Sequence, residues 1–167
     1  MEESGISVII KTIQSLWRSY MNIYTIGFTK ISAEQFFSRL INNHIDIVLD
    51  IRINNTSQLA GFSKYPDIEY FLKSIAAIQY ISDINFAPTE SILKDYKNKN
   101  ISWDEYEKRF ALLMDARNIE GYINKNYDMA LTKNLCLLCS EDKANNCHRR
   151  LVAEYFKQIF GNNIIHL

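Results

Sequence analysis

The sequence predicts a single three-layer α/β domain with a mostly parallel sheet and helices on both faces. Short apolar runs alternate along the chain with segments whose apolar residues recur at helical spacing, which is the pattern of repeated βα units. One of these runs, residues 135–139, contains only leucine and cysteine, as is typical of a strand buried on both faces. A chain of 167 residues, 47% hydrophobic, is long enough for one such domain and short for two. We therefore expect one domain over residues 21–167.

An N-terminal extension, residues 1–20, is expected ahead of this domain. It carries an apolar stripe at helical spacing, which predicts an amphipathic helix that packs on the domain or on a second copy of the chain. The residues of the stripe are Ile6, Ile9, Ile10, Ile13, Leu16 and Trp17. A homodimer through this helix is one interpretation. The alternative is a dispensable tail, because Met21 opens a segment typical of a natural start.

The first half of the domain alternates strands with helices. Residues 23–26 predict a short buried strand that Gly27 closes. Ser32 and Gln35 form a capping box ahead of an apolar stripe, so a helix follows. Residues 45–51 form a nearly continuous apolar run, which predicts a strand of a parallel sheet. Asp67 is then expected to cap a second helix.

The second half repeats the alternation. A weak strand is predicted at residues 79–82, followed by a turn and by a second capping box, Ser102 with Glu105, which opens the longest helix. The apolar strand 135–139 comes next. The last helix is ended by Gly161, and residues 163–167 form a final short strand.

Composition limits the classes of function. Lysine plus arginine and aspartate plus glutamate each number 19, so the net charge is zero, which argues against a dedicated duplex-DNA binder but leaves room for a local basic patch. The mean hydropathy of -0.18 and the lack of a long uncharged apolar run argue against a membrane span. Three cysteines without a signal-peptide pattern predict free thiols in a reducing cytoplasm.

Chemically versatile side chains gather in the segment after the most apolar strand. They are Cys139, Glu141, Cys147, His148, Arg149 and Arg150. In open α/β sheets ligands bind where strand ends and helix N-termini converge, and this segment joins such a strand to the last helix. A thiol near a helix N-terminus and basic residues has a lowered pKa, so Cys139 or Cys147 is the predicted nucleophile. Arg149 and Arg150 are the predicted anion-binding residues.

Two other interpretations of this segment stay open. Cys139, Cys147, His148 and Glu141 together have the donor types of a metal site, but their spacing matches no zinc-finger pattern, so we predict no metal and no cofactor. Cys136 points to the opposite face from Cys139 and is expected in the core. Alternatively, the loop is only stapled by an ion pair of Glu141 with Arg149 or Arg150, and the thiols are inert.

A second cluster is expected at the end of the strand 45–51. Asp50 and Arg52 are two residues apart and share a face, at the strand end where catalytic residues of parallel sheets collect. Asp50, His148 or Glu141 would be the acid–base group or its orienter, and Arg52 would bind the anion. Gly27, at the end of the first strand, would allow close approach of a substrate to the backbone.

With these residues in place, the chain resembles the family named domain of unknown function 488, over about residues 21–167. The resemblance rests on residues 24–28 (YTIGF), 48–52 (VLDIR), 87–90 (APTE), 101–106 (ISWDEY), 137–141 (LLCSE) and 147–150 (CHRR). The final Cys-x-Glu followed by Cys-His-Arg is the most distinctive part. One departure is Phe28, where many members carry a histidine, so a possible acid–base group is missing. The resemblance implies a compact intracellular α/β domain and supplies no established reaction.

We therefore predict an enzyme that acts on an anionic substrate, in particular one bearing phosphate, such as a nucleotide or a nucleic-acid end. The alternative is a non-catalytic module that binds nucleic acid or a protein partner through the same pocket. A third hypothesis is an interaction protein that dimerises through residues 1–20.

Overall fold

The structure is a computed structural model that describes residues 21–167, and it confirms the predicted α/β fold. Five strands form one sheet in the order β3-β2-β4-β1-β5. They are β1 (Asn22–Gly27), β2 (Ile47–Asp50), β3 (Gln79–Ser82), β4 (Leu135–Cys139) and β5 (Asn163–His166). Every pairing is parallel, so the sheet is parallel throughout. The predicted N-terminal helix and its role in dimerisation fall on residues 1–20, outside the described part.

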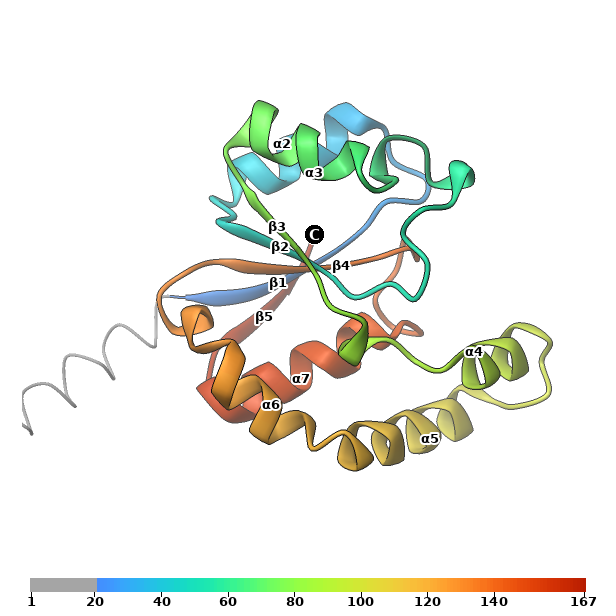
Figure 1. Ribbon diagram of the computed structural model, residues 1–167. Helices are drawn as coiled ribbons and strands as arrows, with labels where there is room; N and C mark the ends of the chain where they lie inside the picture. The colour runs from blue at the N-terminus through green and yellow to red at the C-terminus, as the bar shows by residue number, and fades with distance from the viewer. Residues whose placement is uncertain (1–20) are drawn as a thin grey trace, which may run out of the picture.

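Residues 21–167 form six α-helices, of which five pack on the two faces of the sheet and complete three layers (Figure 1). They are α2 (Ala33–Asn42), α3 (Asp67–Ala76), α4 (Glu90–Lys97), α5 (Trp103–Ala116), α6 (Ile119–Asn126) and α7 (His148–Phe160). Helices α2 and α3 lie on one side of the sheet, and α5, α6 and α7 lie on the other. Helix α4, the start of α5 and the segment between them (residues 90–106) extend beyond the sheet as an arm, which we call the α4–α5 arm (Figure 1). No helix among residues 21–167 combines the length and the apolar character needed to cross a membrane.

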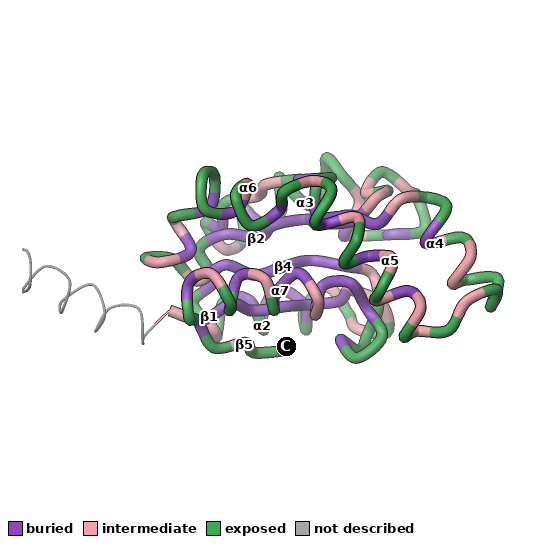
Figure 2. The backbone as a smooth tube through the Cα atoms, turned by 90° about the horizontal axis from the view of Figure 1, so that it is seen from below, coloured by how far each residue is buried: buried purple, intermediate pink, exposed green. Residues whose placement is uncertain are grey.

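The core divides into two clusters because side chains alternate along each strand. In β4, Leu135 and Leu137 face α5, α6 and α7, whereas Cys136 and Leu138 face α2 and α3. Figure 2 shows the central strands β1, β2 and β4 buried between helices that are exposed on their outer sides. Cys136 is fully buried, so its predicted place in the core is confirmed.

Helix ends follow the sequence signals in most places. Ser32 and Gln35 form the predicted capping box, and Ser102 accepts a hydrogen bond from the Glu105 N–H at the start of α5. The predicted cap at Asp67 is wrong: Asp67 is the first helical residue, and Pro66 precedes it without a side-chain cap. Its carboxylate still lies in the first turn, where the helix dipole favours negative charge.

The topology brings the ends of the central strands to one edge of the sheet. Gly27 pairs with Cys139, and Asp50 pairs with Leu138 and with Ser82. The loops that follow β1, β2 and β4 therefore leave the sheet side by side. This carboxyl edge carries the candidate site.

Candidate functional site

A cavity of about 810 Å³ opens at the carboxyl edge of the sheet. Four parts of the chain line it: the loop after β1, the loop after β2, the α4–α5 arm, and the loop between β4 and α7. Of the sequence-predicted site residues, the cavity brings together Arg52, Cys139, Glu141, Cys147 and His148. Asp50, Gly27, Arg149 and Arg150 do not line it. The parallel topology explains why they meet: the loops after β1, β2 and β4 all start at the carboxyl ends of neighbouring strands.

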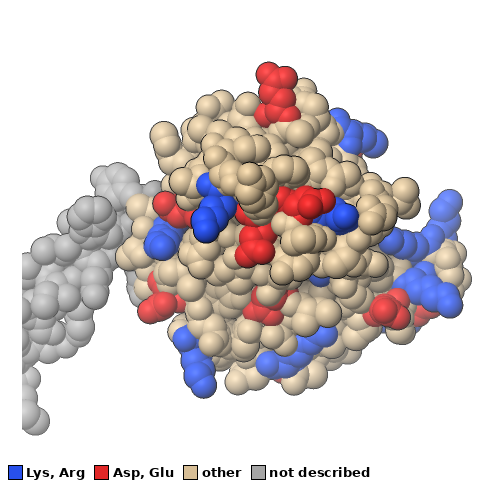
Figure 3. Space-filling model, turned by 45° about the horizontal axis from the view of Figure 1, so that its top comes forward, with Lys and Arg blue, Asp and Glu red and all other residues tan. Residues whose placement is uncertain are grey.

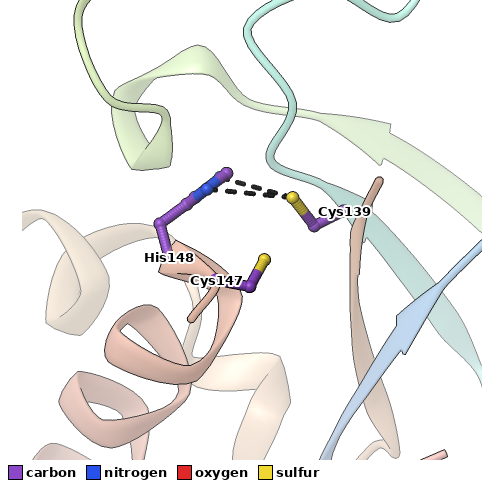
Figure 4. A group of neighbouring side chains, drawn as sticks. All are labelled: Cys139, Cys147 and His148. Atoms are coloured by element: carbon purple, nitrogen blue, oxygen red, sulfur yellow. Dashed lines mark hydrogen bonds between the residues drawn. The ribbon is translucent and has the colours of Figure 1, made fainter. Parts of the chain in front are cut away.

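Cys139, Cys147 and His148 form a compact group at one wall of this cavity (Figure 4). Their sulfur and nitrogen atoms all lie within 4.8 Å of one another, and the three side chains are buried. Cys139 Sγ lies 3.7 Å from His148 Nδ1 and 3.8 Å from Nε2. His148 Nε2 lies 3.0 Å from the carbonyl oxygen of Ile51, which can only accept, so Nε2 donates to it and Nδ1 is the nitrogen that this contact leaves unused.

The two thiols of this group differ in acidity. The pKa of Cys139 is lowered, first by the hydrogen bond from the Cys147 thiol and then, against the effect of burial, by the backbone N–H groups of Ser140 and Glu141 and the charge of Arg149. The pKa of Cys147 is raised because its thiol donates to Cys139 and because it is buried. Cys139 is therefore the more readily ionised thiol of the pair.

Asp50 and Arg52 form a buried ion pair beside the cavity. Arg52 Nε donates to Asp50 Oδ1 at 2.8 Å, and Nη2 donates to Oδ2 at 2.6 Å. Nη1 and Nη2 also donate to the hydroxyl and carbonyl of Ser63, and the Tyr80 hydroxyl donates to Asp50 Oδ2. Burial acts to lower the pKa of Arg52, but the bonds to Asp50 outweigh it and raise that pKa. Four of the five N–H groups of Arg52 are thus used, and one remains for a ligand.

The loop after β4 is held in place by Arg149 and Gly27. The Arg149 guanidinium donates to the carbonyls of Glu141 and Asp142, and its Nε has no partner although it is buried. A Cβ atom at residue 27 would collide with the Glu141 carbonyl, so only glycine allows this loop to approach β1. Gly27 was predicted to admit a substrate to the backbone; the structure places a protein loop there instead.

The ion pair considered for this loop is not formed among the described residues. Arg149 bonds to carbonyls rather than to the Glu141 carboxylate, which is exposed. Arg150 pairs with Glu107 and Glu154. Both guanidiniums are therefore engaged within the protein, and their predicted anion-binding role has no support from the cavity.

Residues of the α4–α5 arm complete the cavity and were not identified from the sequence. Lys97 and Lys99 line it, and within residues 21–167 neither forms a salt bridge. Figure 3 shows lysine and arginine side chains gathered with a few acidic ones at the end of the molecule where this arm lies. Four aromatic side chains also line the cavity: Phe28, Tyr96, Trp103 and Tyr106. The stacked pair of Trp103 and Tyr106, 4.8 Å between ring centroids, could have been suspected only from their spacing of three on a helix.

A parallel sheet with a cavity beyond its strand ends defines a class of α/β proteins that bind ligands at the carboxyl edge. Within this class, the family model DUF488, described as a domain of unknown function, matches residues 32–156, and the chain belongs to that family. The resemblance predicted from the sequence is thereby confirmed. No curated protein and no solved structure matches the chain.

Proposed function

We propose that the protein is an enzyme acting on an anionic substrate with a planar ring, such as a nucleotide or a nucleic-acid end, bound in the cavity at the carboxyl edge. The observation that carries the proposal is the charge of the cavity. Lys97 and Lys99 line it against a single acidic residue, Glu141, while the charge of Arg52 is balanced by Asp50 beside the cavity; the chain as a whole has no net charge. A local excess of positive charge attracts and holds anions.

The aromatic lining of the cavity supports a substrate that contains a planar ring. Phe28 and Arg52 lie on one side, with the guanidinium carbon 5.2 Å from the ring centroid, and Tyr96, Trp103 and Tyr106 belong to the arm. Bases of nucleotides stack on such side chains with little dependence on sequence. A ring held among aromatic residues and a phosphate near the lysines and Arg52 fit the same cavity.

The reactive groups of the proposed enzyme are Cys139, Cys147 and His148, because they line the cavity together and come from a strand end and a helix start. Glu141 is an exposed candidate for the acid–base group. Asp50 acts indirectly by fixing Arg52, and Arg149 and Gly27 act indirectly by fixing the loop after β4. Arg150 has no part in the proposal.

Calorimetric titration with a panel of nucleoside phosphates and short oligonucleotides tests the proposal. We expect one class to bind, and the double variant Lys97→Ala/Lys99→Ala to bind it about tenfold more weakly, which is roughly 1.4 kcal/mol. Lys125→Ala/Lys157→Ala is the matched control, since these lysines end α6 and α7 and do not line the cavity. Absence of binding, or an equal loss in the control, would overturn the anion site. Binding without turnover of any bound class would favour the non-catalytic module.

A further inference from the structure

We propose that Cys139, Cys147 and His148 bind a metal ion, for which Zn²⁺ is the best fit, with a fourth coordination position open to the cavity. The inference rests on the proposed function and deepens it, since it supplies the reactive centre of the same cavity. The sequence predicted no metal because the spacing of these residues matches no common pattern; the juxtaposition exists only in the fold.

The distances suit a tetrahedral ion. With bonds of about 2.3 Å to sulfur and 2.0 Å to nitrogen, neighbouring ligand atoms lie about 3.5–3.8 Å apart. Cys139 Sγ lies 3.7 Å from His148 Nδ1, and all three donor atoms lie within 4.8 Å of one another. Small side-chain adjustments therefore suffice to close the site. The sulfur is almost equally far from both ring nitrogens, so the imidazole has to turn about its Cβ–Cγ bond, which is a soft torsion.

The surroundings of the three donors match those of metal ligands. The Ile51 carbonyl accepts from His148 Nε2, so Nδ1 is the ring nitrogen left to bind the ion; an outer contact of this kind is usual for a ligating histidine. Zn²⁺ with two thiolates and a neutral imidazole also carries no net charge, so its burial avoids the cost of an isolated charge.

The donor set points to an open site. Two thiolates and one imidazole are soft and intermediate ligands that suit Zn²⁺ rather than Mg²⁺ or Ca²⁺. Glu141 lines the cavity but does not belong to the group of three, so the protein supplies three ligands. Zinc sites with three protein ligands keep the fourth position for water or substrate and are typical of catalysis. Because all three residues line the cavity, that position faces the bound anion.

The first test is the metal content of the full chain, purified without chelators and measured by mass spectrometry. We expect about one Zn²⁺ per chain, falling to under about one in ten chains for Cys139→Ser, Cys147→Ser or His148→Ala. Cys136→Ala is the matched control, because this third cysteine faces the other core cluster, and it should keep its metal. Retention of the ion by all three ligand variants, or its loss from Cys136→Ala alone, would overturn the proposal.

A second measurement uses the unaltered chain, in case a ligand variant fails to fold. Metal-free protein is alkylated with iodoacetamide with and without added Zn²⁺, and the modified cysteines are identified by peptide mapping. We expect Zn²⁺ to protect Cys139 and Cys147 at least tenfold, since ligation removes the thiolate lone pair. Equal alkylation in both conditions would overturn the metal site and leave Cys139 as a free nucleophile. Zn²⁺ binding without any anion binding would instead overturn the proposed function alone.

Discussion

Arg52 folds back onto Asp50, two residues earlier in the chain, and both of its side-chain contacts to that carboxylate are shorter than 3 Å. The pair is almost completely shielded from water, with side-chain exposures of 2% for Arg52 and 0% for Asp50. Each group therefore determines the position of the other. Arg52 reaches the cavity in one orientation because Asp50 and Ser63 hold most of its N–H groups.

Breaking this pair should be costly. Arg52→Met leaves the Asp50 carboxylate buried without its counter-charge, so we expect the free energy of unfolding to fall by about 3–5 kcal/mol in urea titrations. The double variant Asp50→Leu/Arg52→Met, which removes both charges, should recover most of that loss. A fall of under about 1 kcal/mol for the single variant would show that water reaches the carboxylate.

Gly27→Ala should disturb the loop after β4. The added Cβ meets the carbonyl of Glu141, and neither backbone segment can move freely, so we expect a loss of about 1–3 kcal/mol by denaturant titration. Gly121→Ala is the control. Its Cβ meets only the side chain of Asn118, and alanine favours a helix interior over glycine by about 1 kcal/mol, so this variant should match or exceed the parent. If Gly27→Ala were more stable than Gly121→Ala, the close approach of the Glu141 carbonyl to residue 27 would be contradicted.

Arg149→Met tests whether this arginine staples the loop after β4. Loss of its bonds to the Glu141 and Asp142 carbonyls should cost about 1.5–3 kcal/mol and speed hydrogen exchange in residues 140–147. Anion affinity should stay unchanged, because Arg149 does not line the cavity. Arg150→Met removes partly exposed ion pairs and should cost under about 1 kcal/mol. If Arg149→Met instead bound anions more weakly and kept the stability of the parent, Arg149 would be an anion-binding residue and not a residue that holds the loop.

His166 should make stability depend on pH below neutrality. Partial desolvation of the exposed His166 ring, followed by the charges of Arg149 and Arg150, lowers the pKa of His166, and its Nδ1 lies 2.8 Å from the Thr25 hydroxyl. The folded state thus favours the neutral ring, so its contribution is present above the ordinary pKa of 6.5 and is lost as the pH falls through the lowered value. His166→Gln should flatten the decline in melting temperature between about pH 7 and 5. An unchanged slope would exclude His166 as its source.

Deletion of residues 1–20 should leave the domain folded, because residues 21–167 by themselves form the five-stranded sheet and the two core clusters described above. We expect calorimetry to show a shift in melting temperature of only a few degrees, corresponding to roughly 1 kcal/mol for a domain of this size. Gel filtration of both forms would show whether the extension dimerises the chain. Loss of folded protein would mean that the extension belongs to the core.

The strands and the meeting of their ends were predictable because both follow from short-range patterns and from parallel topology. β3 and β4 have the predicted bounds. Helix α4 was missed because only Ile92 of its eight residues is buried, which leaves almost no apolar stripe. Helix α6 was missed because the residue that precedes it, Asn118, has a left-handed conformation and provides no side-chain cap.

The cavity was less predictable than the sheet. Cys139, Cys147 and His148 could be placed near one another because a strand end and the following helix must adjoin. Lys97 and Lys99 could not, since their position depends on how the α4–α5 arm packs across the edge. The hydrogen bonds from Arg149 to backbone carbonyls could not be predicted either. The sequence suggests acidic side chains as partners of an arginine, but it does not indicate which backbone oxygens will be buried near it.

The order of the strands has a consequence for synthesis on the ribosome. β4 separates β1 from β2, so these two early strands do not pair with each other: β2 can pair with β3, but β1 has no partner until β4 is made. Until β4 emerges, the nascent chain holds apolar strands with unpaired edges, which are prone to aggregate and slow to find distant partners. A chain that stalls before Leu135 has no central strand on which to assemble. The sheet can therefore form only after β4 has been translated, and a nascent chain that stops earlier exposes strand edges that chaperones must cover.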